Sequence, residues 1–235
     1  MLARAPSSRG KTRLTARLTE ERARALRERL FLDTLTAARA AGFPIVVSYT
    51  PDDAREEMRE LVGEAELIAQ RGGDLGERMR NAMLDALASG AEAVVLIGSD
   101  LPTLPPENIV HAFKILEGVG LSPAEASAHV VSANSRVDVV FGPAADGGFY
   151  LIGAREELPD IFGGVAWSRP DVLARVAHAA REAGLIVGLV REYRDVDSPE
   201  DLQRLGLTES GASVPDASCD AATTRKVRGF LETDS

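Results

Sequence analysis

Ala93-Val94-Val95-Leu96-Ile97-Gly98-Ser99-Asp100-Leu101-Pro102 is the stretch of sequence that decides the fold. Its apolar part, residues 93–97, is too short to cross a membrane and has the β-branched character of a buried strand. A Gly-Ser pair ends the run, and Pro102 prevents the strand from continuing. Asp100 is therefore predicted at the carboxyl end of a parallel strand, where open α/β sheets bind ligands. A carboxylate there can hold a divalent cation, and the cation can hold the phosphates of a nucleotide.

Strand-like and helix-like segments alternate on both sides of this stretch. We expect strands at 45–49, 93–97, 137–141, 149–152 and 185–190, and helices at 19–41, 51–61, 74–88, 106–116 and 170–183, with a short last helix from Ser198. This alternation predicts an α/β fold with a mostly parallel sheet and helices on both faces. The close spacing of 137–141 and 149–152 predicts a hairpin-like departure near the edge of the sheet.

Length and composition favour one domain. The chain has 235 residues, 45% of them hydrophobic, which is enough for one sizeable core over residues 1–208. From residue 209 to 235 the sequence turns polar and loses periodicity, so we expect a disordered tail. A single cysteine excludes a disulfide framework within the chain. With no signal peptide and no apolar run of membrane-spanning length, we expect a cytoplasmic protein without a membrane partner.

Charge is distributed unevenly along the chain. The net charge is −9, which argues against nucleic acid as a partner. Residues 1–41 nevertheless carry a net +6, and the remainder carries −15. A solvated helix explains the arginines at 22, 24, 27 and 29, but not the cations that precede it. The basic start of an acidic chain suggests a local anionic ligand.

The loop before that helix, residues 5–14, is rich in small residues and cations. Its amides can cradle phosphate oxygens while Lys11 and Arg13 neutralise their charge, with Gly10 allowing close approach and Arg4 nearby. An exposed loop without a ligand fits the same pattern. The spacing is not that of a Walker loop, which disfavours a P-loop NTPase.

Two further motifs combine turn chemistry with possible binding chemistry. Asp74 with Glu77 is typical of a capping box, while Arg78 could point toward phosphates at the same helix start. The Asp146-Gly147-Gly148 sequence is ordinary hairpin-turn chemistry. If its strand neighbours the one before Asp100, Asp146 could also bind an acceptor hydroxyl or act as a general base.

Two single residues complete the set of candidates. Asp197 precedes a helix capped by Ser198, and it is either another acid at a helix start or a second metal ligand. Trp167, the only tryptophan, is either partly buried core or a wall of the pocket. The three histidines show no ligand spacing.

Taken in order, five motifs resemble one family over residues 1–207. They are the Arg-Ala-Pro-x-x-x-Gly-Lys-Thr-Arg-Leu opening, Gly-Asp-Leu-Gly-Glu-Arg-Met at 73–79, Ile-Gly-Ser-Asp-Leu-Pro at 97–102, Gly-Pro-Ala-x-Asp-Gly-Gly-Phe-Tyr-Leu-Ile-Gly at 142–153 and Asp-Val-Asp-Ser-Pro-Glu-Asp-Leu at 195–202. The chain resembles a bacterial glycosyltransferase-A-like family of unknown function. Members of this family are also called radical-SAM and selenodomain-associated transferases or arsenosugar-biosynthesis glycosyltransferases. The implied fold is that of nucleotide-diphospho-sugar transferases, a Rossmann-like three-layer α/β/α sandwich.

The resemblance also implies roles for particular residues. Lys11 and Arg13 would bind phosphates, Asp100 would bind Mg²⁺ or Mn²⁺, and the turn at 146–148 would face the acceptor or sugar. The chain departs from the family pattern at two places. Its first strand is cut short, so the true start could lie upstream of Met1, and residues 118–136 look longer than usual.

The expected function is a metal-dependent transferase with a nucleotide-activated donor. One version transfers a sugar from a nucleotide sugar to a small-molecule acceptor. A second uses a nucleoside triphosphate and releases pyrophosphate, because the opening and the Asp-Leu-Pro motif are similar to phospholactate guanylyltransferases and molybdenum-cofactor nucleotidyltransferases. A third is a non-catalytic nucleotide- or sugar-binding protein on the same fold.

Overall fold

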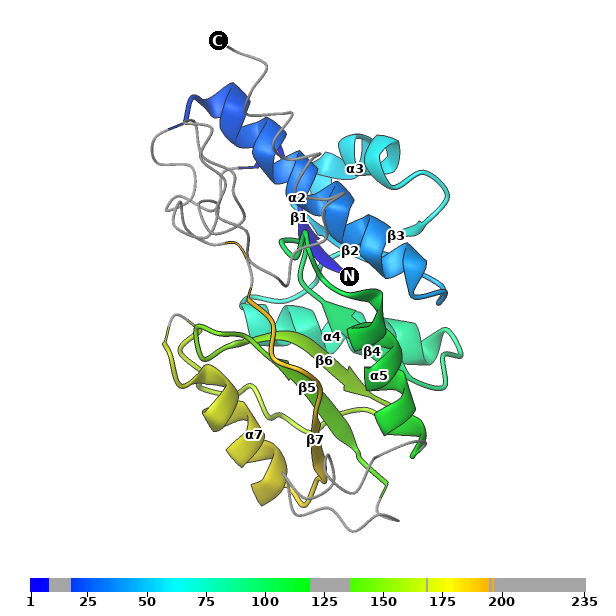
Figure 1. Cartoon of the computed structure of the whole chain (residues 1–235), viewed down its shortest axis with the longest axis vertical. Helices are drawn as coiled ribbons and strands as arrows, with labels where there is room; N and C mark the ends of the chain where they lie inside the picture. The colour runs from blue at the N-terminus through cyan, green and yellow to red at the C-terminus, as the bar shows by residue number, and fades with distance from the viewer. Residues whose placement is uncertain (9–17, 119–135, 168, 195, 197–235) are drawn as a thin grey trace.

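The computed structural model describes residues 1–8, 18–118, 136–167, 169–194 and 196 (Figure 1). Its strands are β1 (Leu2–Arg4), β2 (Val46–Thr50), β3 (Glu66–Ala69), β4 (Val94–Ile97), β5 (Val139–Pro143), β6 (Phe149–Ala154) and β7 (Val187–Leu189). Its helices are α2 (Glu20–Ala40), α3 (Arg55–Val62), α4 (Leu75–Ala88), α5 (Pro106–Glu117) and α7 (Val172–Glu182), and a 3-10 turn η1 (Asp52–Ala54) precedes α3.

Helix starts follow the capping residues in the sequence. The Thr19 hydroxyl accepts the amide of Arg22 at the start of α2, and the Asp74 carboxylate accepts the amide of Glu77 at the start of α4. Gly118 ends α5 in the left-handed conformation, where a side chain would be strained. The predicted helices within the described residues are therefore present.

The strands form two sheets, which lie side by side and share one hydrophobic core. The first has the order β1-β2-β3 and is parallel throughout. The second has the order β4-β6-β5-β7, in which β6 is antiparallel to both of its neighbours and β5 is parallel to β7. The predicted mostly parallel α/β fold is confirmed. The predicted hairpin-like departure is present, because β5 and β6 are antiparallel neighbours. The two strands occupy the inner positions of the second sheet, between β4 and β7.

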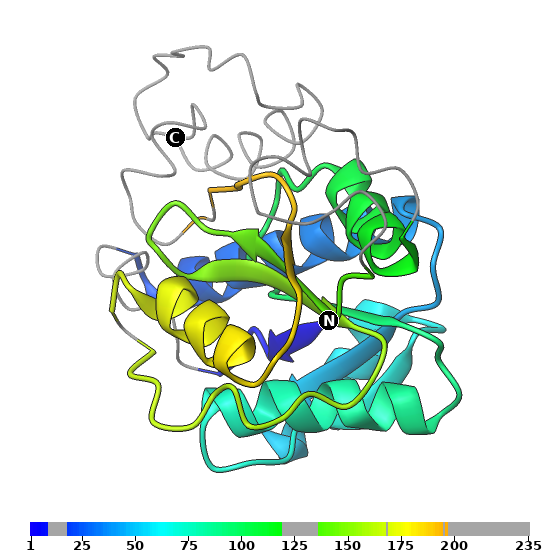
Figure 2. The same ribbon diagram turned by 90° about the horizontal axis from the view of Figure 1, so that it is seen from below.

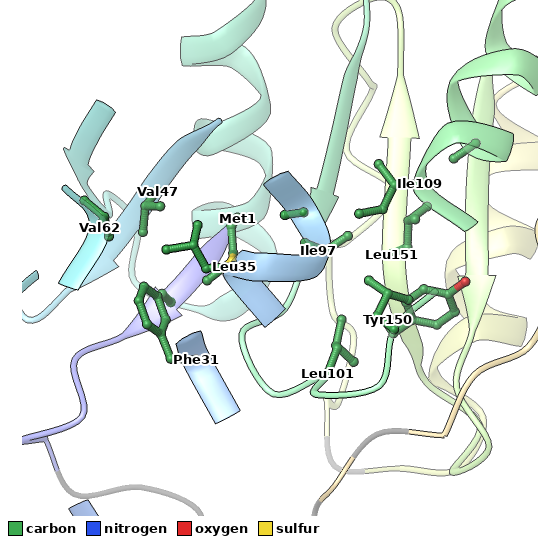
Figure 3. Close-up of a cluster of buried hydrophobic side chains, with 14 of the residues drawn as sticks. Met1, Phe31, Leu35, Val47, Val62, Ile97, Leu101, Ile109, Tyr150 and Leu151 are labelled. Carbon is green, nitrogen blue, oxygen red and sulfur yellow. The ribbon is translucent and has the colours of Figure 1, made fainter. Parts of the chain in front are cut away.

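Alternating side chains bury both faces of the strands. Leu96, Phe141 and Ile152 belong to a core that α4 and α7 cover, and Ile97 and Leu151 belong to a second core that α5, α2 and α3 cover. Figure 2 shows α4 and α5 on opposite sides of the strands. The second core continues across the two sheets, since Met1 and Leu35 share it with Ile97 and Leu101 (Figure 3). This alternation produces the three-layer arrangement.

One strand, β3, was not predicted from the sequence. β3 has the sequence Glu66-Leu67-Ile68-Ala69, too short and too mixed to stand out as an apolar run. β1 spans three residues, Leu2–Arg4. The expected helix at Ser198, the long segment 118–136 and the polar tail lie outside the described residues, except for residues 118 and 136.

Candidate functional site

Two of the predicted acidic residues lie in loops at the same end of the second sheet. Ile97 of β4 and Gly142 of β5 both pair with Leu151 of β6. Asp100 follows the end of β4, and Asp146 lies in the connection from β5 to β6. Both acids therefore lie at the carboxyl ends of β4 and β5, the end at which α/β sheets bind ligands.

The loop that carries Asp100 is held from two sides. The Leu101 amide donates to the Thr34 hydroxyl at 2.8 Å, and that hydroxyl donates to the Leu30 carbonyl at 2.8 Å within α2. On the other side, the Thr103 amide donates to the Tyr193 hydroxyl at 3.1 Å, and the Thr103 hydroxyl lies 2.8 Å from the same oxygen. Asp100 itself is half-buried.

The turn that carries Asp146 is built by its own hydrogen bonds. The Gly147 amide donates to the Ala144 carbonyl at 3.0 Å, and the Gly148 amide donates to Asp146 Oδ1 at 2.9 Å. Gly147 has φ +89°, and a Cβ there would lie 1.8 Å from the Pro170 carbonyl oxygen. The hairpin-turn interpretation is therefore correct, and it leaves the Asp146 carboxylate exposed at the surface.

Aromatic side chains connect this turn to the start of α4. The Trp167 ring contacts Phe149 edge-on, with ring centroids 6.3 Å apart, and Phe162 at 5.9 Å. A Cβ on Gly76 would lie 2.9 Å from Trp167 Cζ2 and 2.6 Å from Phe162 Cβ. Trp167 is half-buried. It is thus both part of the core and a neighbour of two predicted motifs.

The start of α4 follows the capping interpretation. The Gly73 amide donates to Glu77 Oε2 at 2.7 Å, which complements the bond from Glu77 to Asp74. The Arg78 guanidinium donates to the Gly72 carbonyl at 3.1 Å. Arg78 therefore braces the glycine loop at the helix start, and its side chain is half-exposed.

The entry to the basic loop is anchored by a buried arginine. Arg27 is 8% exposed, and its guanidinium donates to the Pro6 carbonyl at 2.8 Å and to Glu20 at 2.6 Å. The interpretation of Arg27 as part of a solvated helix face is wrong, because its stem packs against the core while its head satisfies the loop backbone. Arg4, at the end of β1, is exposed.

Four of the predicted site residues lie outside the described residues: Gly10, Lys11, Arg13 and Asp197. Within the described ranges, no group of three or more acidic, histidine or cysteine side chains is placed to hold a metal ion. The structure thus places Asp100 and Asp146 at the carboxyl ends of β4 and β5, and it places Trp167 in contact with Phe149, which follows the Asp146 turn, and with the start of α4.

Sequence reasoning missed the residues that hold these loops in place. Tyr193 follows β7, and its backbone flanks the Asp146 turn: its amide donates to Pro143 at 2.9 Å and its carbonyl accepts from Ala145 at 3.1 Å. The Tyr150 hydroxyl accepts from Asn108 at 3.0 Å and donates to the Arg191 carbonyl at 2.9 Å. Burial raises the pKa of Tyr150, so it stays a protonated donor. In the sequence, the signal that could have indicated Tyr193 is its position shortly after the end of a strand.

A large cavity runs along β4. Its volume is about 540 Å³, and its lining is mostly apolar: it includes Val46 of β2, Val94 of β4 and Ala86 of α4, together with Met1 and Phe43. The buried amino group of Met1 donates to the Val46 carbonyl at 2.7 Å, and desolvation lowers its pKa to about 5. The predicted site residues do not line this cavity. We therefore keep the candidate site at the carboxyl ends of the strands.

Comparison with known proteins agrees with this fold. No curated protein matches the chain. A solved structure described provisionally as a nucleotide-diphospho-sugar transferase from Desulfovibrio desulfuricans G20 is 30% identical, with a TM-score of 0.76, and the match covers 98% of this chain and 94% of that one. A CMP:2-keto-3-deoxy-manno-octonic acid synthetase in complex with CTP is 13% identical, with a TM-score of 0.52, over 87% of this chain and 94% of that one. This second likeness shows the fold alone.

The described residues contain no helix with both the length and the apolar character needed to span a bilayer. A family model for uncharacterized proteins conserved in bacteria, DUF2064, matches residues 33–169. The family resemblance predicted from the motifs is thereby confirmed: the chain belongs to the DUF2064 family and has the nucleotide-diphospho-sugar transferase fold.

Proposed function

We propose that the protein is a metal-dependent transferase that uses a nucleotide-activated donor, with a nucleotide-diphosphate sugar as that donor and a small molecule as the acceptor. The observation that carries the proposal is the position of Asp100 and Asp146 at one end of the second sheet, beside the aromatic group around Trp167. The 30% identity to a protein described as a nucleotide-diphospho-sugar transferase supports the same chemistry.

In this proposal Asp100 is the first carboxylate ligand for Mg²⁺ or Mn²⁺, and Asp197 is the second carboxylate ligand. A half-buried carboxylate suits these cations, because proteins often hold Mg²⁺ by one or two carboxylates while substrate phosphates supply further oxygens. The bound cation would stabilise the negative charge that develops on the departing diphosphate.

The cationic groups would bind the rest of the diphosphate. Lys11 and Arg13 are assigned to the phosphate oxygens, with the Gly10 amide and Arg4 beside them, and Arg78 is assigned to the same anion from the start of α4. Lys11 would also stabilise the leaving group in the transition state. The Arg27 bond to Pro6 supports this assignment, because it fixes the backbone where the loop begins.

The acceptor or sugar would lie against the turn and the aromatic group. Gly147 and Gly148 are assigned to the acceptor or sugar through their backbone, and Trp167 offers an apolar ring to the sugar. Asp146 Oδ1 is engaged by the Gly148 amide, so the carboxylate is oriented without being buried. In this proposal the carboxylate would accept a proton from an acceptor hydroxyl.

A second candidate is nucleotidyl transfer from a nucleoside triphosphate to a phosphorylated acceptor. The cations of the basic loop suit a triphosphate, and the chain shares its fold with a synthetase that binds CTP. In that reaction an acceptor phosphate oxygen attacks the α-phosphorus, a new P–O bond forms, and pyrophosphate leaves.

A thermal-shift screen with Mn²⁺ tests the proposal, because a molecule that binds only the folded state raises the melting temperature. The probes are UDP-glucose, GDP-mannose, ATP, GTP, CTP and UTP, each with and without Mn²⁺. Stabilisation by a nucleotide sugar that requires Mn²⁺ supports glycosyl transfer. Pyrophosphate released from a triphosphate supports nucleotidyl transfer instead, and binding without turnover supports a non-catalytic protein.

Asp100→Asn is the decisive variant. We expect the apparent affinity for Mn²⁺, measured from this stabilisation, to fall about a hundredfold because a metal ligand is lost, while the chain keeps its fold without metal. Asp138→Asn is the matched control, because Asp138 lies at the amino end of β5 and bonds the Ile186 amide. Equal metal response of Asp100→Asn and wild type would contradict the metal assignment.

A further inference from the structure

We propose that Tyr193 is a positioning residue that fixes the Asp100 loop relative to the Asp146 turn. The inference rests on the proposed function for its consequence, but its geometric part can be tested without any ligand. Tyr193 lies on the segment that follows β7, and it contacts Thr103 on one side and Pro143 and Ala145 on the other.

The backbone of Tyr193 is bonded to the turn side. Its amide donates to Pro143 and its carbonyl accepts from Ala145, and residues 144 and 193 form an isolated parallel β-bridge. These bonds extend the β5–β7 pairing by a few residues, up to the position just before Asp146. The turn therefore cannot shift without displacing the backbone of Tyr193.

The side chain of Tyr193 is bonded to the loop side. Its hydroxyl accepts a hydrogen bond from the Thr103 amide at 3.1 Å and lies 2.8 Å from the Thr103 hydroxyl. These two residues are 90 positions apart in the sequence. Thr103 is three residues after Asp100 and is separated from it by Leu101 and Pro102, which are both buried. Loss of the hydroxyl would therefore free one end of a short, otherwise fixed loop.

The ring of Tyr193 is itself kept in place. It packs against Tyr150, with ring centroids 5.3 Å apart at 57°. The Tyr150 ring in turn occupies the space over Gly142, where a Cβ would lie 2.5 Å from it. The hydroxyl at 193 thus has a defined position to which the Asp100 loop is attached.

The consequence concerns the order of the loop and the affinity for metal. A ligand carboxylate on a fixed loop binds a cation without the cost of ordering that loop. Since the hydroxyl provides about two hydrogen bonds, its removal is expected to weaken Mn²⁺ binding about tenfold. The protein would keep its fold, because Phe fills the same space.

Tyr193→Phe tests the proposal with two measurements on the full chain. Hydrogen exchange followed by mass spectrometry is expected to show faster exchange in residues 98–104, where the Thr103 amide loses its acceptor. Electron paramagnetic resonance of free Mn²⁺ is expected to show about tenfold weaker binding of the metal alone. Thr103→Ser keeps the hydroxyl and is expected to behave as wild type in both measurements.

Tyr150→Phe is the matched control. It removes a neighbouring tyrosine hydroxyl with two partners, but it leaves both contacts of Thr103 in place. We expect lower thermal stability with wild-type exchange in residues 98–104. If both variants change that exchange equally, a general loss of stability explains the data and the proposal is wrong.

The outcomes separate the two proposals. Unchanged exchange of residues 98–104 in Tyr193→Phe overturns the positioning role, whatever the metal does. Faster exchange with unchanged Mn²⁺ affinity also overturns it, because the loop would then not control the ligand. No Mn²⁺ binding by wild type overturns the proposed function and the role that depends on it.

Discussion

The loop that follows β4 and the strand itself have different surroundings. In the loop of Asp100, backbone amides donate hydrogen bonds to hydroxyl groups from α2 and from the segment after β7. The strand, in contrast, lines a mostly apolar cavity of about 540 Å³ along its whole length. Hydrogen bonds between residues far apart in the sequence therefore fix the loop of the candidate site, whereas the strand before it has open space along its side.

The largest expected effect comes from adding one methyl group to the Asp146 turn of the candidate site. Gly147→Ala places a Cβ 1.8 Å from the Pro170 carbonyl oxygen at a φ of +89°, and we expect a loss of about 4 kcal/mol in the free energy of unfolding. Urea denaturation measures it. Gly164→Ala is the control, because its φ is +70° but no atom lies within 4 Å, so backbone strain alone should cost about 1 kcal/mol.

The residues around the cavity are tested by the pH dependence of stability, because the buried amino group of Met1 belongs to a residue that lines the cavity. The pKa of this group is about 5 in the folded chain and 8.0 as a free group. Between these values the unfolded chain binds more protons, so the free energy of unfolding should rise with pH from about 5 to 8, by at most about 4 kcal/mol. Urea titrations at several pH values measure the slope.

A chain with Gly-Ser added before Met1 serves as the control for that slope. It replaces the amine with an amide, which does not titrate, so the difference between the two chains isolates this group. Identical slopes would contradict the burial of the amine.

A smaller effect is expected at the hydroxyl that joins α2 to the Asp100 loop. Thr34→Val keeps the shape of the side chain but leaves the buried Leu101 amide without an acceptor, at a cost of about 2 kcal/mol. Thr36→Val is the control, because its hydroxyl also bonds the carbonyl four residues earlier but lies on the exposed face. Equal losses in the two variants would show that Leu101 gains little from Thr34.

The smallest effect compares the same enlargement beside the cavity and at a fully packed position. Ala86→Leu extends into the cavity, and we expect a gain of about 1 kcal/mol from apolar burial. Ala112→Leu places the same atoms in α5 at a fully buried position, where overpacking should cost about 2 kcal/mol. Differential scanning calorimetry compares both with wild type, and changes of the same sign would remove the contrast.

Local chemistry made most of the fold predictable. The Thr19 and Asp74 caps and the apolar run before Asp100 each depend on neighbours in sequence, and each is present as expected. The position of β6 between β4 and β5 was not predictable, because strand order is set by tertiary packing. β3 was missed because four residues with a charged first position give no clear pattern.

The candidate site was predictable only in part for the same reason. Asp100 and Asp146 could be found because each lies three residues from the end of a strand. The bonds of Tyr193 to Thr103 and of Leu101 to Thr34 join residues 90 and 67 positions apart, and no local pattern indicates them. Arg27 was misinterpreted because a charged side chain on a helix is usually exposed, and its partner is a backbone carbonyl in a distant loop.

The single tryptophan gives this protein a built-in optical probe. Trp167 lies between Phe149, Phe162 and the start of α4, beside the turn of Asp146. Its indole emission depends on the polarity around the ring, and no second tryptophan contributes a background signal. Changes in emission on adding a nucleotide sugar would therefore report events at this one place, in the unlabelled chain and in real time.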